Sequence, residues 1–155
     1  MTSQAKYTPT GIAPSHHYED GAAMIDWLTR VLGFEERARY VDRDGRVRQA
    51  ELYVGDCEFW LNGHEAGYWE KLGRRPDTGV VIFVDDVDAV YERVRAAGVD
   101  APPPEDRTWG VRGFFLKDPE GYGWSFVRRL ERGYVQTKSL EEGGLKEIKG
   151  PPRRR

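Results

Sequence analysis

The sequence predicts an α+β fold built from two βαβββ modules that follow one another along the chain. Three pairs of turn residues recur 65 or 66 positions apart, and each pair stands at the same place in a strand, helix and hairpin order. A module of roughly 60 residues leaves one face of its small sheet bare, so two modules are expected to lean together around a shared cleft. The three pairs are Asp20 and Asp86, Gly33 and Gly98, and Gly55 and Gly121.

The first module is predicted to contain a strand, a helix and three further strands. Its helix has apolar residues at helical spacing between the cap Asp20 and the terminating Gly33. The single cysteine, Cys57, is expected to fill a small place in the core. The expected ranges are strands over 12–18, 34–41, 48–54 and 57–61 and a helix over 22–32, within a module of about residues 10–62.

The second module, about residues 79–130, repeats this order after an irregular surface connection over residues 62–78. A buried strand is expected first, and Asp86 then caps a helix that Gly98 ends. Three consecutive prolines force an extended link, which leads to an aromatic hairpin around an Asp-Pro-Glu-Gly turn. The expected strands are residues 80–84, 113–116 and 122–126.

Composition and charge exclude several classes of function. Residues 1–130 carry a net charge of −5, and an acidic body is a poor surface for nucleic acid. The sequence lacks a run of about 20 apolar residues that could span a membrane, and its single cysteine fits a reducing compartment, so we expect a cytoplasmic protein. Residues 131–155 carry +3 and lack periodicity, which predicts a polar, solvated C-terminal extension without regular structure.

The aromatic hairpin carries a family resemblance. Trp109-Gly110, then Arg112, then an Asp-Pro-x-Gly-x-x-Trp motif starting at Asp118 resemble the end of a glyoxalase/bleomycin-resistance/dioxygenase domain, of the vicinal oxygen chelate superfamily. The resemblance covers about residues 10–130. It implies that the paired modules form a curved mixed sheet, a half-barrel whose concave face holds a ligand or metal. It also implies a homodimer, because members commonly complete their cleft with a second chain.

The resemblance further implies where a metal would be bound. In metal-dependent members, four ligands come from the first and last strands of each module. None of the residues at the matching positions is a strong ligand for a divalent metal, so we expect no metal cofactor. A divalent metal ion remains the alternative, with His17 and Glu58 as its substitute ligands. The four matching positions are Ala13, Phe59, Gly79 and Ser125.

Two residues near the last hairpin are candidates for binding a small molecule. Trp109 and Arg112 are expected at the mouth of the cleft, where an indole and a guanidinium could hold a flat or anionic ligand. The competing interpretation is that Trp109 packs on its own hairpin and Arg112 pairs with a surface acid. The further candidates for ligand contact are His17, Phe59, Phe83 and Ser125.

Three functions are compatible with these patterns. The first is a metal-free protein of the bleomycin-resistance type, which binds an aromatic or anionic small molecule and has no catalytic residues. The second is a metal-dependent lyase, isomerase or ring-cleaving dioxygenase of the same superfamily. The third is an adaptor that uses its basic C-terminal extension to bind a partner. We favour the first, because the expected metal-ligand positions lack ligands.

Overall fold

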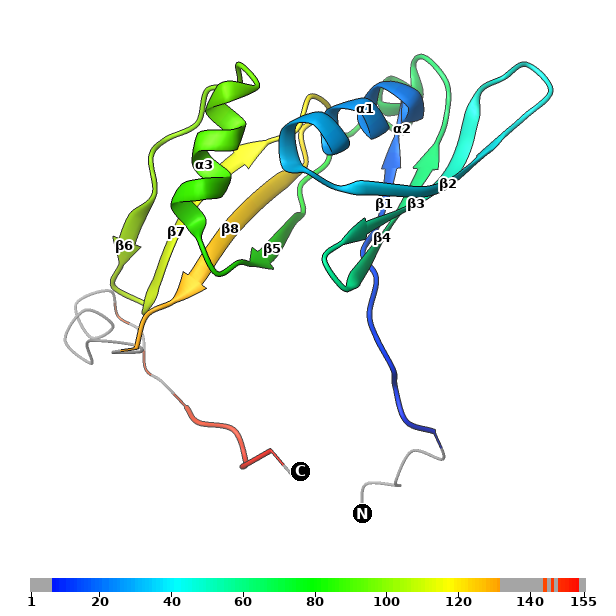
Figure 1. Ribbon diagram of the computed structural model, residues 1–155. Coiled ribbons are helices and arrows are strands. Elements are labelled where there is room, and N and C mark those ends of the chain that lie inside the picture. The colour runs from blue at the N-terminus through cyan, green and yellow to red at the C-terminus, as the bar shows by residue number, and fades with distance from the viewer. Residues whose placement is uncertain (1–6, 132–143, 145, 147, 154–155) are drawn as a thin grey trace.

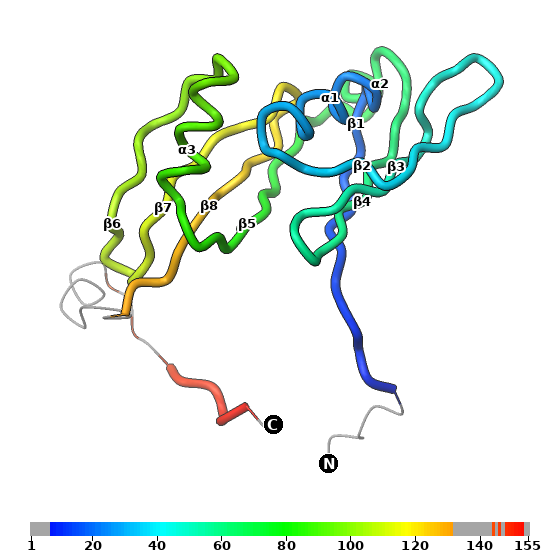
Figure 2. Tube along the Cα trace, in the orientation of Figure 1, coloured from blue at the N-terminus to red at the C-terminus, as the bar shows by residue number. Residues whose placement is uncertain are grey.

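A computed structural model of the chain describes residues 7–131, 144, 146 and 148–153. Within these residues, eight strands and three helices follow one another (Figures 1 and 2). The first module contains β1 (Ser15–Tyr18), α1 (Gly21–Leu32), β2 (Glu35–Val41), β3 (Val47–Val54) and β4 (Cys57–Gly63). The helix α2 (Tyr68–Leu72) leads to β5 (Gly79–Phe83), α3 (Val87–Ala96), β6 (Glu105–Arg107), β7 (Val111–Lys117) and β8 (Gly123–Arg129) of the second module.

The strands form two four-stranded sheets. Sheet 1 has the order β1-β4-β3-β2, and sheet 2 has the equivalent order β5-β8-β7-β6. The strands β1 and β4 are parallel, as are β5 and β8, and the other neighbouring pairs are antiparallel. The predicted α+β class and tandem βαβββ order are therefore confirmed. The curved mixed sheet consists of two separate sheets, since no backbone pairing joins them in the described residues.

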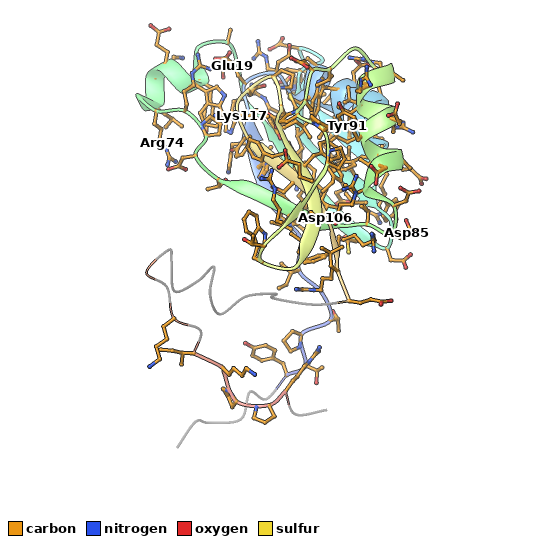
Figure 3. All side chains as sticks on the ribbon, turned by 90° about the vertical axis from the view of Figure 1, so that its left-hand side faces the viewer. Glu19, Arg74, Asp85, Tyr91, Asp106 and Lys117 are labelled. Atoms are coloured by element: carbon orange, nitrogen blue, oxygen red, sulfur yellow. The ribbon has the colours of Figure 1, made fainter. Side chains whose placement is uncertain are left out.

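Both long helices begin at the predicted caps. The carboxylates of Asp20 and Asp86 each accept a hydrogen bond from the backbone N–H three residues later, at 3.0 Å in both helices. Gly33 ends α1 with a φ of 76°, in the left-handed region that favours glycine. The helices lie next to each other, and each covers one face of its sheet (Figure 1). Figure 3 shows Tyr91 on the side of α3 that faces sheet 2, with its ring centroid 5.4 Å from that of Phe114.

Two short elements differ from the sequence prediction. The connection predicted to be irregular contains the five-residue helix α2, whose Trp69 is buried. The strand β6, three residues long, follows the prolines and pairs with β7 at the edge of sheet 2. Neither segment is long enough to show a periodic pattern, so tertiary contacts rather than local sequence determine them.

Both modules contribute to one hydrophobic core, whose largest fully buried side chains include Trp124, Tyr18 and Phe59. The expectation that Cys57 fills the core was wrong, because this side chain is exposed. Cys57 lies on the same side of β4 as the buried Phe59 and Leu61, but it is the first residue of the strand, beside a turn. The buried part of β4 therefore begins at Phe59, two residues after Cys57.

The described residues contain no helix that is long and apolar enough to span a membrane. The predicted cytoplasmic location stays a prediction. Most of the predicted C-terminal extension, residues 131–155, lies outside the described residues.

Candidate ligand-binding site

One face of sheet 2 is covered by α3, and the opposite face, which we call the open face, carries an exposed set of apolar side chains. Along β8, Trp124 and Phe126 are buried toward the helix, whereas Ser125 and Val127 point to the open face. Four further side chains on this face are unusually exposed for apolar residues. They are Val81 (58% exposed), Phe83 (57%), Trp109 (49%) and Phe115 (45%).

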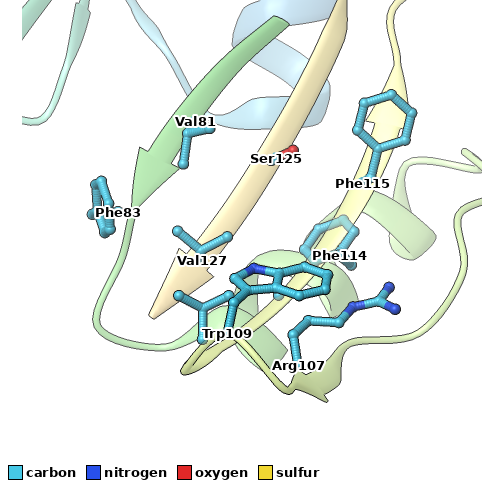
Figure 4. A pocket seen from close by; sticks show the side chains of 10 residues that line it. Val81, Phe83, Arg107, Trp109, Phe114, Phe115, Ser125 and Val127 are labelled. Atoms are coloured by element: carbon cyan, nitrogen blue, oxygen red, sulfur yellow. The ribbon is translucent and has the colours of Figure 1, made fainter. Parts of the chain in front are cut away.

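These side chains surround a pocket of about 460 Å³. Figure 4 shows Val81, Ser125 and Phe115 projecting into it from three neighbouring strands, with Trp109 lying across one end. Gly113 lines the floor, where a Cβ atom would come within 2.8 Å of the Val127 side chain. A pocket of this size, with mostly apolar walls and few polar groups, is typical of a small-molecule site.

The turn between β6 and β7 positions the indole of Trp109. Gly110 has a φ of 85°, which favours glycine, and its N–H donates to the carbonyl of Arg107 at 3.1 Å. The guanidinium carbon of Arg107 lies 5.7 Å from the centroid of the Trp109 ring, within the range of a cation–π contact. The tight turn therefore holds an aromatic plate and a cation together at the end of the pocket.

Three of the predicted ligand-binding residues, Trp109, Phe83 and Ser125, come together in this pocket. Sequence reasoning missed Val81 and Phe115. Both pair with Ser125 across the sheet, so they share its face. The strand register gives that information, and the order of residues along the chain does not.

Arg112 lies on the opposite face of β7 from the pocket. Its guanidinium donates to both carboxylate oxygens of Asp88, at 2.9 and 2.7 Å, and to Asp106 at 3.2 Å. These bonds raise the pKa of Arg112 and lower the pKa of Asp88. The structure thus matches the competing interpretation, in which Arg112 pairs with surface acids.

The remaining two candidates lie elsewhere. Phe59 is buried and borders a second cavity of about 320 Å³, between β4 and β5 at the junction of the modules. His17 lies at the end of β1, and its Nδ1 is 2.8 Å from Nε2 of His64. The ring of His64 in turn stacks on Tyr68, with centroids 3.8 Å apart. Partial burial and the neighbouring His17 lower the pKa of His64, which favours the neutral form of His64.

The side chains present do not fit a divalent metal. No group of three or more His, Cys, Asp or Glu residues in the described part of the chain is arranged to hold one. The substitute ligands are too far apart, because His17 pairs with Asn62 and Glu58 precedes Asn62 by four residues on β4. At about 3.3 Å per residue, the Cα atoms of His17 and Glu58 are separated by about 13 Å along the strands. They cannot share one metal ion.

A buried polar network joins the two modules, and sequence reasoning did not identify it. The Asp118 carboxylate is only 4% exposed and accepts from the Tyr18 hydroxyl at 2.7 Å and the Trp124 indole at 3.1 Å. It also accepts three backbone N–H groups of its own turn, at 2.9 to 3.1 Å. Burial, followed by the nearby Asp118, raises the pKa of Tyr18. The Asp-Pro-Glu-Gly turn was the signal that could have identified Asp118.

His16 extends this network, since its Nδ1 lies 3.2 Å from the Tyr18 hydroxyl. The Tyr18 proton is donated to Asp118, so we assign the shared proton to His16 Nδ1. Burial, with a smaller effect of His17, lowers the pKa of His16 to about 4. A second carboxylate, Glu120, accepts from the Trp69 indole at 2.7 Å and from the backbone N–H of Glu19 at 2.6 Å. The turn of the second module thereby binds β1 and α2.

Comparison with known proteins gives a consistent result. The family described as the Glyoxalase/Bleomycin resistance protein/Dioxygenase superfamily matches residues 17–126. An uncharacterized protein of Mycobacterium bovis is 28% identical over 143 residues, which cover 85% of this chain and 93% of that protein. Among solved structures, TioX from Micromonospora sp. ML1 is similar at 30% identity and a TM-score of 0.64, covering 79% of this chain and 100% of TioX.

A third similar protein is the bleomycin-binding protein of bleomycin-producing Streptomyces verticillus, solved as a complex with copper(II)-bleomycin. It is 23% identical with a TM-score of 0.57, and the match covers 77% of this chain and 96% of that protein. At this identity the similarity supports the shared fold.

Proposed function

The chain belongs to the Glyoxalase/Bleomycin resistance protein/Dioxygenase superfamily, and from that premise we propose that it is a metal-free small-molecule binding protein of the bleomycin-resistance type. It would hold an aromatic ligand in the pocket of sheet 2 and act by sequestering it. The observation that carries this proposal is the set of exposed aromatic side chains, Trp109, Phe83 and Phe115, around one pocket. The bleomycin-binding relative provides a precedent for this function on the same fold.

Stacking and desolvation would supply the affinity. A planar ligand placed against Trp109 would cover apolar surface that water now contacts, at about 25 cal/mol per Å². The Ser125 hydroxyl in the middle of the pocket could donate to or accept from a polar group of the ligand. Because the four positions expected to hold a metal carry Ala13, Phe59, Gly79 and Ser125, we assign no step to a metal ion.

We also propose that the protein forms a homodimer in which the open face of sheet 1 of one chain stands opposite the open face of sheet 2 of the other, so that the partner completes the cleft and the ligand lies between the two sheets. The open face of sheet 2 exposes four large apolar side chains around one pocket, and an exposed apolar set of this kind is typical of a contact surface. The open face of sheet 1 presents Trp60 and Tyr53, each 38% exposed, as aromatic partners. An exchange of this kind gives two equivalent contacts around a two-fold axis, so the assembly closes as a dimer.

The binding proposal can be tested with the neutral fluorescent probe N-phenylnaphthylamine. We expect saturable binding that excess EDTA does not change, because no metal takes part. Trp109→Ala should weaken this binding about five- to tenfold through loss of the stacking surface, whereas Trp109→Phe should retain most of it. Probe binding that EDTA abolishes and a divalent ion restores would instead support the metal-dependent enzyme. Affinity that is unchanged in Trp109→Ala would place the ligand elsewhere.

A further inference from the structure

The end of the pocket next to Trp109 carries two arginines on the open face. Arg107 of β6, Val111 of β7 and Arg129 of β8 are paired in one row across sheet 2. Paired residues of antiparallel strands project from the same face, and Val111 lines the pocket. The two arginine side chains therefore project from the same end of the open face, one on each side of β7; Arg107 lines the pocket, and Arg129 lies over Phe83 beside it.

Each guanidinium lies against an aromatic ring that lines the pocket. The guanidinium carbon of Arg107 is 5.7 Å from the Trp109 ring centroid, and that of Arg129 is 4.8 Å from the Phe83 ring centroid. These cation–π contacts restrict two side chains that would otherwise be mobile. The positive charges are thus held over the rings of Trp109 and Phe83, both of which line the pocket.

The charges at this end are incompletely neutralised. Arg107 pairs with Glu105 at 3.0 Å, whereas Arg129 forms no ion pair with a carboxylate within the described residues. No acidic side chain lines the pocket itself. An anionic group at this end would therefore meet the guanidinium of Arg107 or that of Arg129 and no competing carboxylate inside the pocket. Two guanidiniums beside an apolar wall provide strong, directional donors for a carboxylate or sulfonate.

We propose that the pocket selects aromatic ligands that carry an anionic group, and that Arg107 and Arg129 are the residues that determine this specificity. This inference rests on the binding function proposed above and specifies its ligand class. The planar part of the ligand lies on Val81, Val127 and Trp109, and its carboxylate or sulfonate lies beside the guanidinium of Arg107 or that of Arg129.

The test compares two probes that differ in charge. Anilinonaphthalene sulfonate carries one sulfonate, whereas N-phenylnaphthylamine has a similar aromatic frame and is neutral. Both dissociation constants are measured by fluorescence titration of the full-length protein. We expect the double variant Arg107→Ala with Arg129→Ala to weaken the anionic probe at least tenfold and the neutral probe less than twofold.

Arg128→Ala is the matched control. It removes one positive charge from the neighbouring residue of β8. Arg128 is the cross-strand neighbour of Arg112, however, and projects from the face of sheet 2 that α3 covers. It should change neither probe by more than about twofold. Equal losses from Arg128→Ala and Arg129→Ala would reduce the effect to overall charge and overturn the proposal.

The same titrations distinguish a failure of the anion specificity from a failure of the proposed binding function. If Trp109→Ala weakens both probes but the double arginine variant does not discriminate between them, the binding function stands and the anion specificity is wrong. If neither probe responds to Trp109→Ala, the pocket is not the binding site and both proposals fail. Both arginines are at the rim and outside the core, so we expect the variants to fold, which thermal denaturation checks.

Discussion

The open faces of the two sheets share one pattern of strand pairing but differ in chemistry. A row of three paired residues crosses the centre of each face. In sheet 1 two of the three are polar or charged, whereas in sheet 2 two of the three are apolar and exposed. The rows are Ser15, Trp60 and Glu51 in sheet 1, and Val81, Ser125 and Phe115 in sheet 2.

The next row shows the same contrast. His17 stands at the position of Phe83, and the residue paired with each of them is Asn62 in sheet 1 but Val127 in sheet 2. Backbone hydrogen bonds fix the pairing, and they do not depend on which side chains project from the free face. The repeated modules therefore keep one architecture while each face is free to take a different role. The pocket lies on the second module because the side chains on its open face differ from those of sheet 1, whereas the strand pairing is the same in both sheets.

The largest expected effect comes from a variant that disrupts the buried contact between the two modules. Asp118→Ala leaves the buried Tyr18 hydroxyl and Trp124 indole without their acceptor and removes the bonds that hold the turn. We expect the free energy of unfolding, measured by urea denaturation, to fall by about 3–5 kcal/mol. Asp118→Asn, which keeps one acceptor oxygen, should lose less, and the exposed Asp85→Ala should be close to neutral. A loss below about 1 kcal/mol in Asp118→Ala would show that the network does not join the modules.

A second variant gives sheet 2 the side chains of sheet 1. Val81→Ser combined with Phe83→His introduces the residue types found at Ser15 and His17. We expect the dimer dissociation constant, measured by sedimentation equilibrium, to rise at least tenfold, because about two apolar side chains leave the contact.

The control for this variant is Val41→Ser. Val41 is 56% exposed, nearly the same as Val81, but it pairs with the buried Val47 and so lies on the other side of sheet 1. It should leave the dimer intact. If the unmodified protein sediments as a monomer at micromolar concentration, the dimer proposal is wrong.

Much of the fold follows from local patterns in the sequence. Asp20 and Asp86 cap their helices as predicted, since an aspartate before an apolar, helically spaced run satisfies free backbone N–H groups. In both helices the deciding interaction lies within a few residues of the chain. Ser125, which the family resemblance placed among the candidate site residues, lies in one pocket with Phe83 and Trp109.

The site residues that were missed depend on distant partners. The acid that binds Arg112 is Asp88, 24 residues earlier, and only the packing of α3 on sheet 2 brings the two together. His64 reaches His17 from just beyond the C-terminal end of β4, and Arg129 of β8 reaches Phe83 of the neighbouring β5. No spacing in the sequence encodes such contacts, because register and helix docking determine them.

The sheet faces that pack into the core also differ between the modules, and the pH dependence of the unfolding free energy measures that difference. His16 stands 66 residues before Ile82, so a buried histidine replaces an aliphatic residue. The pKa of His16 is lowered to about 4, so between pH 6.5 and 4 the unfolded chain binds a proton that the folded chain does not. This contribution to stability is complete above pH 6.5, falls as the pH is lowered through that window, and is constant below it.

We expect the fall to be about 2 kcal/mol, since each unit of pKa shift corresponds to about 1.4 kcal/mol and partial access of water reduces the total. His16→Ile should flatten the profile of unfolding free energy between pH 6.5 and 4.5, whatever its stability at pH 7. His64→Gln should leave most of the slope in place, because His64 is only partly buried. Identical slopes in the unmodified protein and His16→Ile would mean that other groups cause the pH dependence.

The smallest expected effect concerns Arg112 and decides which side of sheet 2 recognises an anion. Arg112 is bound to Asp88 and Asp106 on the side of α3, and exposed ion pairs contribute little to stability. Arg112→Ala should therefore lower the thermal midpoint by about 2 °C or less and change the affinity for anilinonaphthalene sulfonate less than twofold. Arg112→Lys should be nearly silent in both measurements, although an ammonium cannot reproduce the two-pronged contact with Asp88. A tenfold loss of the anionic probe in Arg112→Ala, with Arg129→Ala unaffected, would move anion recognition to the helix side of the sheet. The contrast between the two open faces would then describe dimer contacts and would no longer explain ligand choice.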